Sequence, residues 1–153
     1  MSVFLRPTTK GDLPFVIEIE QNAAGDRFVT SQGLELHESY VLDDDVRHYI
    51  VEDEGRRVGY VILAGLSDAN ETIEFRRMVI AEKGKGYGRQ VLRMMKKIVF
   101  EDLGAHRLWL DVKDFNLAAR SLYESENFVV EGTWREHLKT DNGRESIVFM
   151  SIL

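Results

Sequence analysis

One stretch of the sequence limits the fold more than any other: a glycine-rich turn that joins a predicted strand to the most amphipathic helix. Gly84, Gly86 and Gly88 alternate along this turn, and the apolar positions of residues 88–103 repeat with a helical period. Glycine lets the backbone turn tightly and approach a ligand closely. The free N–H groups of a helix's first turn, together with the helix dipole, favour an anion there. The sequence therefore predicts a strand–turn–helix unit that can hold phosphate groups.

Basic side chains flank these glycines, namely Lys83, Lys85 and Arg89. A Walker loop would end in Gly-Lys-Ser/Thr, and a dinucleotide fingerprint would need Gly-x-Gly-x-x-Gly, so the turn fits neither pattern. An ordinary tight turn with solvated lysines is the alternative interpretation. Because a strand precedes the turn, a long helix follows it and three cations surround it, we expect a diphosphate cradle.

The remaining elements follow from the spacing of apolar and turn-forming residues. We expect a loop over 22–33 and strands over residues 3–6, 48–52, 58–64, 72–80, 107–112, 128–133 and 146–153. We expect helices over residues 13–20, 34–42, 88–103 and 116–126. Strands followed by a β-α-β unit predict a single α/β domain over residues 1–153, with a mixed sheet and helices on both faces.

Composition excludes several classes of function. The chain of 153 residues has 26 acidic and 20 basic side chains, a net charge of −6, and no cysteine. The absence of cysteine excludes disulfides, thiolate metal sites and a cysteine acyl-enzyme, and the four histidines lack metal-binding spacing, so we expect no metal. The acidic balance argues against nucleic-acid binding. No apolar stretch approaches the roughly 20 residues that span a bilayer, and no secretory signal is present, so we expect a cytoplasmic protein without membrane contact.

Two segments resemble the GCN5-related N-acetyltransferases. Residues 83–88 (Lys-Gly-Lys-Gly-Tyr-Gly) resemble the family's Q/R-x-x-G-x-G/A loop, with Lys83 where Gln or Arg is usual. Residues 116–128 resemble its N-x-x-A-x-x-x-Y-x-x-x-G-F segment, with Asn127 in place of glycine. Asparagine tolerates the left-handed conformation that ends a helix, so this departure is mild. The resemblance is nearest to the branch of ribosomal-protein N-terminal acetyltransferases and polyamine acetyltransferases.

This resemblance implies the fold and the cosubstrate. It implies a mixed sheet of about seven strands in which a bulge splays two parallel strands, 72–80 and 107–112, to form an acyl-CoA cleft. Arg76-Arg77 breaks the alternation of a buried strand, which fits such a bulge or a strand that lines a wet cleft. Acetyl-CoA would be the cosubstrate. The implied coenzyme-binding residues are Met78, Val79, Ile80, Lys83, Gly84, Lys85, Gly86, Tyr87, Gly88, Arg89, Asn116 and Tyr123.

The resemblance also implies transfer of acetyl to a primary amine by direct attack in a ternary complex. The family tyrosine that points at the coenzyme sulfur corresponds to Tyr123, and a phenol with an ordinary pKa near 10 can protonate a leaving thiolate. Packing in the core is the alternative role for Tyr123. Glu74 is the candidate base, directly or through water, and an ion pair with Arg76 is its alternative role. Glu35 and Glu38 are rival bases.

The substrate and the partners stay open at this stage. Residues 35–54 are mostly acidic and residues 83–107 mostly basic. We hypothesise that the basic part faces coenzyme phosphates and that the acidic part attracts a cationic amine, while a merely solvated loop at 43–45 is the alternative. A protein N-terminal amine is the first expected substrate and a small polyamine-like amine the second. A non-catalytic acyl-CoA-binding sensor is the alternative from another class, and the family also allows a homodimer.

Overall fold

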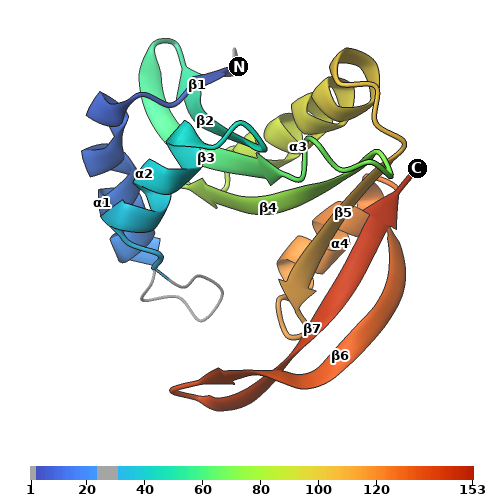
Figure 1. The fold of residues 1–153 in the computed structure, drawn as a ribbon. Coiled ribbons are helices and arrows are strands. Elements are labelled where there is room, and N and C mark those ends of the chain that lie inside the picture. Colours follow the sequence, from blue (N-terminus) through green and yellow to red (C-terminus); the bar gives the residue numbers. More distant parts are fainter. Residues whose placement is uncertain (1–2, 24–30) are drawn as a thin grey trace.

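A seven-stranded mixed sheet in the order β1-β2-β3-β4-β5-β7-β6 organises the chain (Figure 1). The computed structural model describes residues 3–23 and 31–153, so positions 24–30 of the predicted loop lie outside the described residues. The strands are β1 (Val3–Pro7), β2 (Val46–Asp53), β3 (Arg56–Ala64), β4 (Thr72–Ile80), β5 (Arg107–Lys113), β6 (Val129–Thr140) and β7 (Gly143–Ile152). The helices are α1 (Leu13–Ala23), α2 (Leu34–Leu42), α3 (Tyr87–Lys97) and α4 (Leu117–Ser125).

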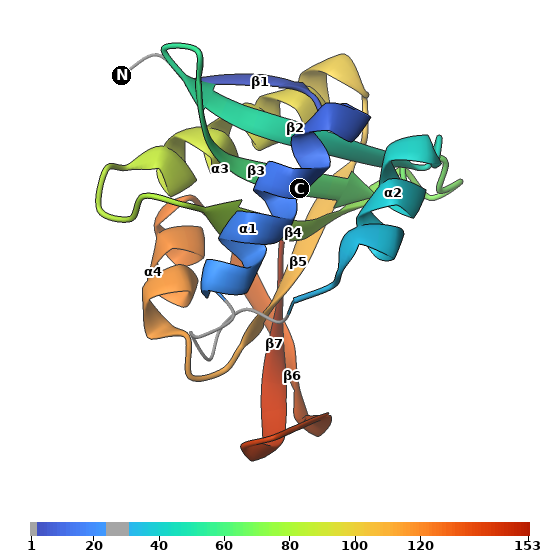
Figure 2. The ribbon, with the colours of Figure 1, turned by 90° about the vertical axis from the view of Figure 1, so that its left-hand side faces the viewer.

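Most predicted elements are confirmed, and two strands are longer than predicted. Strand β4 and helix α2 have the predicted bounds, and the predicted helix 88–103 comprises α3 and a π-helical turn, Ile98–Asp102. The predicted strands 128–133 and 146–153 are wrong in extent, because β6 and β7 form one long hairpin that projects from the rest of the fold (Figure 2). Strand β6 is exposed along almost its whole length, so its sequence carries no alternation of buried and exposed side chains.

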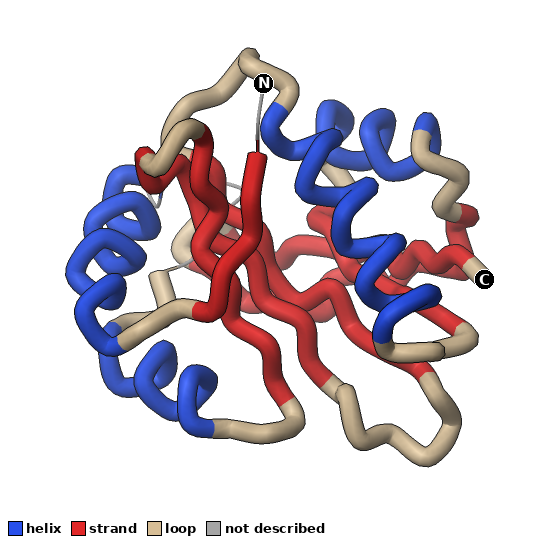
Figure 3. The backbone as a smooth tube through the Cα atoms, turned by 90° about the horizontal axis from the view of Figure 1, so that it is seen from above, coloured by secondary structure: helices blue, strands red, loops and turns tan. Residues whose placement is uncertain are grey.

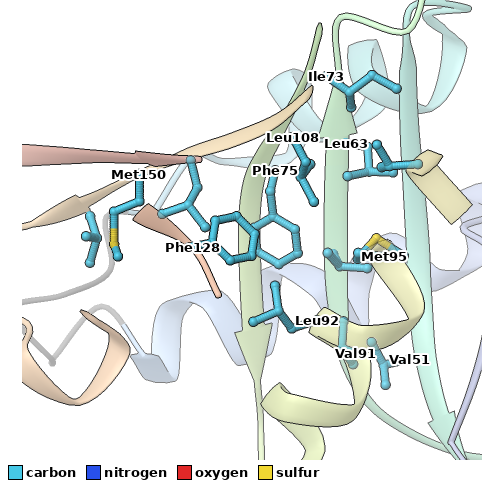
Figure 4. Packing of buried hydrophobic residues seen from close by; sticks show 14 of the residues in the cluster. Val51, Leu63, Ile73, Phe75, Val91, Leu92, Met95, Leu108, Phe128 and Met150 are labelled. Atoms are coloured by element: carbon cyan, nitrogen blue, oxygen red, sulfur yellow. The ribbon is translucent and has the colours of Figure 1, made fainter. Parts of the chain in front are cut away.

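Helices cover both faces of the sheet, as Figure 3 shows. Alternate side chains of β3 point to opposite faces, so Tyr60 and Ile62 pack with α1 while Val61 and Leu63 pack with α3. The larger cluster gathers buried residues of α3, β4, β5 and β7 around Phe75 (Figure 4). Both faces of the central strands are therefore buried. None of the described helices is long and apolar enough to cross a membrane.

The parallel strands β4 and β5 pair only at one end. Residues Thr72–Glu74 of β4 pair with Arg107–Trp109 of β5, and beyond this point the two strands diverge (Figure 1). Opposite β3, Ile62 faces Arg77 and Leu63 faces Phe75, so Arg76 is an extra residue in β4. Such an extra residue is a β-bulge, which bends its strand. The predicted splayed pair and the predicted bulge are both confirmed.

A buried carboxylate joins α3 to the end of α4. Glu126 is 5% exposed and accepts hydrogen bonds from Arg89 Nη1 at 2.8 Å, Arg93 Nε at 2.9 Å and Lys96 Nζ at 3.3 Å. The hydrogen bond from Arg93 contributes most to lowering the pKa of Glu126 to about 2, against the opposing effect of burial. Three cations of the basic part therefore bind Glu126, and the hypothesis that this part faces coenzyme phosphates stays a prediction.

Replacement of this carboxylate by an amide tests its contribution to stability. We expect Glu126→Gln to lower the free energy of unfolding by about 1–2 kcal/mol at pH 7, because the partly exposed Arg89, the exposed Arg93 and the half-buried Lys96 lose their shared charged acceptor. The folded-state pKa is lowered, so the contribution is complete above the ordinary pKa of 4.5 and is lost as the pH falls toward 2. Urea unfolding at pH 7 and pH 3 measures both effects.

The matched control is Glu124→Gln, an exposed carboxylate on the same helix, which should change stability by less than about 0.5 kcal/mol. Equal stability of the Glu126→Gln variant and the wild type at pH 7 would contradict a stabilising clamp.

Candidate active site

The glycine turn ends in an open helix terminus. Gly84 and Gly86 have positive φ angles of 80° and 76°, and Gly86 is the N-cap of α3. The first hydrogen bond of the helix runs from Gln90 N–H to the Gly86 carbonyl at 3.2 Å. The N–H groups of the turn before Gln90 therefore have no acceptor within the helix. They border a cavity of about 410 Å³, which we call the glycine-loop cavity.

Most of the predicted coenzyme-binding residues line this cavity, and a few do not. Met78, Val79, Ile80, Lys83, Gly84, Gly86, Tyr87, Gly88 and Asn116 line it. Lys85 does not line it and pairs with Glu82 at 3.0 Å. Arg89 does not line the cavity either, and its guanidinium donates to Ser125 at 2.9 Å and to Glu126. Among the three predicted basic side chains, Lys83 alone lines the cavity.

The backbone of Met78, Val79 and Ile80 has one free edge. These residues pair with Val61, Tyr60 and Gly59 of β3 on one side. On the other side, the pairing of β4 with β5 within the described residues ends at Glu74. The edge of β4 that faces the divergence therefore keeps backbone donors and acceptors for a ligand with amide groups.

A second cavity of about 330 Å³ continues the first toward β5, and we call it the tyrosine cavity. Both cavities share the wall residues Met78, Val79, Asn116, Ala119 and Leu122. Asn116 also caps α4, since its Oδ1 accepts from the Ala119 N–H at 3.2 Å. Its capping and lining roles therefore hold together.

Tyr123 lines the tyrosine cavity from α4. Its ring packs against Phe128, with the ring centroids 5.9 Å apart, and within residues 3–23 and 31–153 its hydroxyl has no hydrogen-bond partner. Burial, followed by the nearby Asp111 carboxylate, raises the pKa of Tyr123 to about 12. The phenol therefore stays protonated across neutral and mildly alkaline pH.

Sequence reasoning missed Asp111 of β5, which lines the tyrosine cavity with Tyr123. Loss of hydration contributes most to raising its pKa, and repulsion by Glu74 adds to it. A raised pKa makes the carboxylate a stronger base than an ordinary aspartate. The sequence did contain a signal for Asp111: it is a polar residue in a strand of alternating apolar residues, and that strand was already predicted to border the cleft.

The carboxylates predicted as bases lie elsewhere. Glu74 lines neither cavity and accepts from Arg76 Nε at 3.0 Å and Nη2 at 2.8 Å, which is the alternative role given above. Glu35 and Glu38 of α2 line neither cavity. No group of three or more His, Cys, Asp or Glu side chains in the described part of the chain could hold a metal ion.

A substitution in the glycine turn tests the cradle. We expect Gly86→Val to weaken binding of coenzyme A about tenfold or more, because a β-branched residue strains at a φ of 76° and displaces the turn. Calorimetric titration with coenzyme A measures the dissociation constant.

The matched control is Gly143→Val, which puts the same side chain at a positive φ of 99° in the distant β6–β7 turn. It should lower stability and leave coenzyme affinity unchanged. A similar loss of affinity in both variants would show that backbone strain alone, and not the cradle, is responsible.

Comparison with known proteins identifies the family. The sequence profile of the acetyltransferase (GNAT) family matches residues 13–128. A spermidine N(1)-acetyltransferase of Escherichia coli (strain K12) is 28% identical over 139 residues, which cover 86% of this chain and 75% of the relative.

Solved structures agree with this match over the whole fold. The structure of a spermidine N-acetyltransferase from Vibrio cholerae in complex with CoA and spermine has a TM-score of 0.87 and 27% identity, covering 99% of this chain and 95% of that one. A chimera of the Vibrio cholerae enzyme and hSSAT has a TM-score of 0.89 and 26% identity, covering 100% and 96%. The chain belongs to the GNAT family and is an acetyl-CoA-dependent N-acetyltransferase.

Proposed function

We propose that this enzyme transfers the acetyl group of acetyl-CoA to a primary amine of a polyamine such as spermidine, by direct attack in a ternary complex. The observation that carries the proposal is the tyrosine cavity, which Tyr123 and Asp111 line together with Met78 and Val79 of the free edge of β4. This arrangement brings a proton donor and a proton acceptor into the same cavity.

The similar proteins favour a polyamine over a protein N-terminus. The Escherichia coli relative is a spermidine N(1)-acetyltransferase, and the Vibrio cholerae structure holds CoA and spermine. Among the described residues, Asp111 is the one carboxylate that lines the tyrosine cavity, and it supports an ammonium acceptor. A protein N-terminal amine is the second candidate substrate, because the sequence resembles that branch as well.

Proton transfer defines the roles of the side chains. When bound, acetyl-CoA supplies a thioester carbon, to which the amine nitrogen bonds as the carbon–sulfur bond breaks. Asp111 takes the proton that the amine must lose, and Tyr123 donates a proton to the sulfur. Backbone N–H groups near Met78–Ile80 face the carbonyl oxygen and stabilise its developing charge. Glu74 supports Asp111 by raising its pKa, and it is the alternative base.

The proposed reaction is tested by thiol release from acetyl-CoA with a panel of spermidine, spermine and a peptide with a free N-terminal alanine. We expect the wild type to turn over the polyamines and Tyr123→Phe to lower kcat about 100-fold, with the KM for acetyl-CoA little changed, because the leaving sulfur loses its proton donor. Because the pKa of Tyr123 is about 12, the wild-type rate should not fall between pH 8 and pH 10.

Preference for the peptide would assign the second substrate class. Tight coenzyme binding without turnover of any amine would favour the non-catalytic sensor. A chain that does not bind coenzyme A would contradict the whole proposal.

The identity of the base is tested by comparing Asp111→Asn with Glu74→Gln. If Asp111 is the base, Asp111→Asn lowers kcat/KM for the amine about 100-fold. Glu74→Gln then lowers it by less, because it removes the partner of Arg76 and the repulsion that adds to the raised pKa of Asp111 but leaves the base in place. Rates over a range of amine concentrations from pH 6 to 10 measure kcat/KM in both variants, and a larger loss in Glu74→Gln would assign the base to Glu74.

A further inference from the structure

Four buried polar side chains form a continuous hydrogen-bonded chain on the α1–α2 face of the sheet. Thr8 Oγ1 lies 2.7 Å from His48 Nδ1, His48 Nε2 lies 3.1 Å from His37 Nδ1, and His37 Nε2 lies 2.5 Å from Glu20 Oε2. Glu20 and His37 are fully buried, and the Tyr60 ring covers both imidazoles at centroid distances of 5.3 Å. Burial of so many polar groups requires a compensating interaction for each of them.

This series of hydrogen bonds ends at the carboxylate of Glu20, which accepts from His37. Burial, followed by the neighbouring His37, lowers the pKa of His48 to about 4, so His48 is neutral near pH 7 and shares one proton with His37. Glu20 then accepts from His37 through one oxygen. Its other oxygen accepts from the Gln32 backbone N–H and lies 3.5 Å from Arg77 Nη1. Three donors around one fully buried carboxylate hold its position and its negative charge.

Arg77 connects this buried chain to the tyrosine cavity. It follows the bulge in β4, its side chain is 15% exposed, and it lines the cavity together with Tyr123 and Asp111. Glu20 reaches Arg77 from behind the cavity wall, because Glu20 itself is fully buried and lines neither cavity.

Each cation that lines the tyrosine cavity has an acidic partner outside it. Arg76 pairs with Glu74, Arg77 with Glu20, and Lys113 with Glu145 at 3.1 Å. Asp111 is the carboxylate on the wall, and within residues 3–23 and 31–153 it has neither a hydrogen bond nor an ion pair. Counted over the described residues, the wall therefore carries three cations paired with carboxylates and one further negative charge, which suits a cationic amine.

We propose that Glu20 is a positioning and specificity-determining residue: held by the Thr8–His48–His37 chain, it neutralises Arg77 so that a cationic amine can approach Tyr123 and Asp111. Glu20 does not touch the substrate, and it acts through the charge and placement of Arg77. The inference rests on the proposed function for the charge of the acceptor. Without the carboxylate of Glu20, the positive potential of the Arg77 guanidinium at the wall would be higher and would repel the incoming ammonium more strongly.

The test is a charge-balance cycle of Glu20→Gln, Arg77→Gln and the double variant. We expect Glu20→Gln to raise the KM for spermidine about tenfold and to leave the KM for acetyl-CoA within about twofold. The double variant should restore the KM for spermidine, because it removes the cation together with its buried partner. The control Glu18→Gln, an exposed carboxylate on the same helix with no contact to the chain, should leave both constants unchanged.

Two further readouts separate positioning from folding and from the proposed function. Thermal unfolding shows whether each variant folds, and a purely structural role predicts a lower Tm in the double variant without recovery of the KM. Hydrogen exchange of the Arg77 Nε–H, followed by NMR, needs no substrate. We expect it to be slow in the wild type and in Glu18→Gln and at least about tenfold faster in Glu20→Gln.

The outcomes decide the inference in each case. An unchanged spermidine KM in Glu20→Gln, or no recovery in the double variant, overturns it. Absence of wild-type turnover contradicts the proposed function, and the exchange rates then decide the positioning role alone. Fast exchange in the wild type overturns that role.

Discussion

The limited pairing of the two parallel strands β4 and β5 is the constraint on which the rest of the site depends. Three residue pairs hold them together, and the bulge at Arg76 bends β4 away immediately afterwards. A parallel strand in a closed sheet would satisfy both of its backbone edges. Here the edge of Met78–Ile80 stays available, and α4 borders the divergence with Asn116 and Tyr123. The two continuous cavities follow from this one departure from regular pairing.

The divergence also explains why the charges of the site are arranged in pairs. An opening in the middle of a sheet exposes side chains of a central strand that would otherwise be buried, and in this chain two of them are arginines. Arg76 and Arg77 pair with carboxylates on opposite sides, Glu74 beside the cavity and Glu20 behind it. On α3, Arg89, Arg93 and Lys96 share the single carboxylate of Glu126, and among the predicted basic side chains of the glycine turn Lys83 lines the glycine-loop cavity. Much of the basic charge near the site is thus engaged in contacts within the protein.

The spacing of apolar and turn-forming residues predicted those elements whose structure is determined by residues close together in the sequence. The glycine turn, α3 and β4 could be predicted because their apolar spacing and turn residues are contiguous. The full length of β6 could not, since its side chains are exposed on both faces and Glu136 interrupts the strand with a φ of 51°. The bulge was implied by the family resemblance, and the two arginines, standing where a buried strand has apolar residues, fitted it.

Long-range polar contacts mark the limit of sequence reasoning. Glu20, His37 and His48 belong to three different elements, and nothing in their spacing indicates that they form one chain. Asp111 is similar: its strand was predicted, but which polar side chain of that strand enters the cavity depends on how far β5 diverges from β4. Glu74 was the natural candidate from sequence because it stands on the other strand, whereas the geometry turns it toward Arg76.

Backbone hydrogen exchange with and without acetyl-CoA is the decisive measurement for the role of the diverging strands. If acetyl-CoA binds along the free edge of β4 and on the first turn of α3, the amides of residues 78–80 and 84–89 should exchange more slowly with the ligand. The amides of the β6–β7 hairpin tip should exchange at the same rate in both states. Unchanged rates at residues 78–80 and 84–89 under saturating acetyl-CoA would contradict binding between the strands.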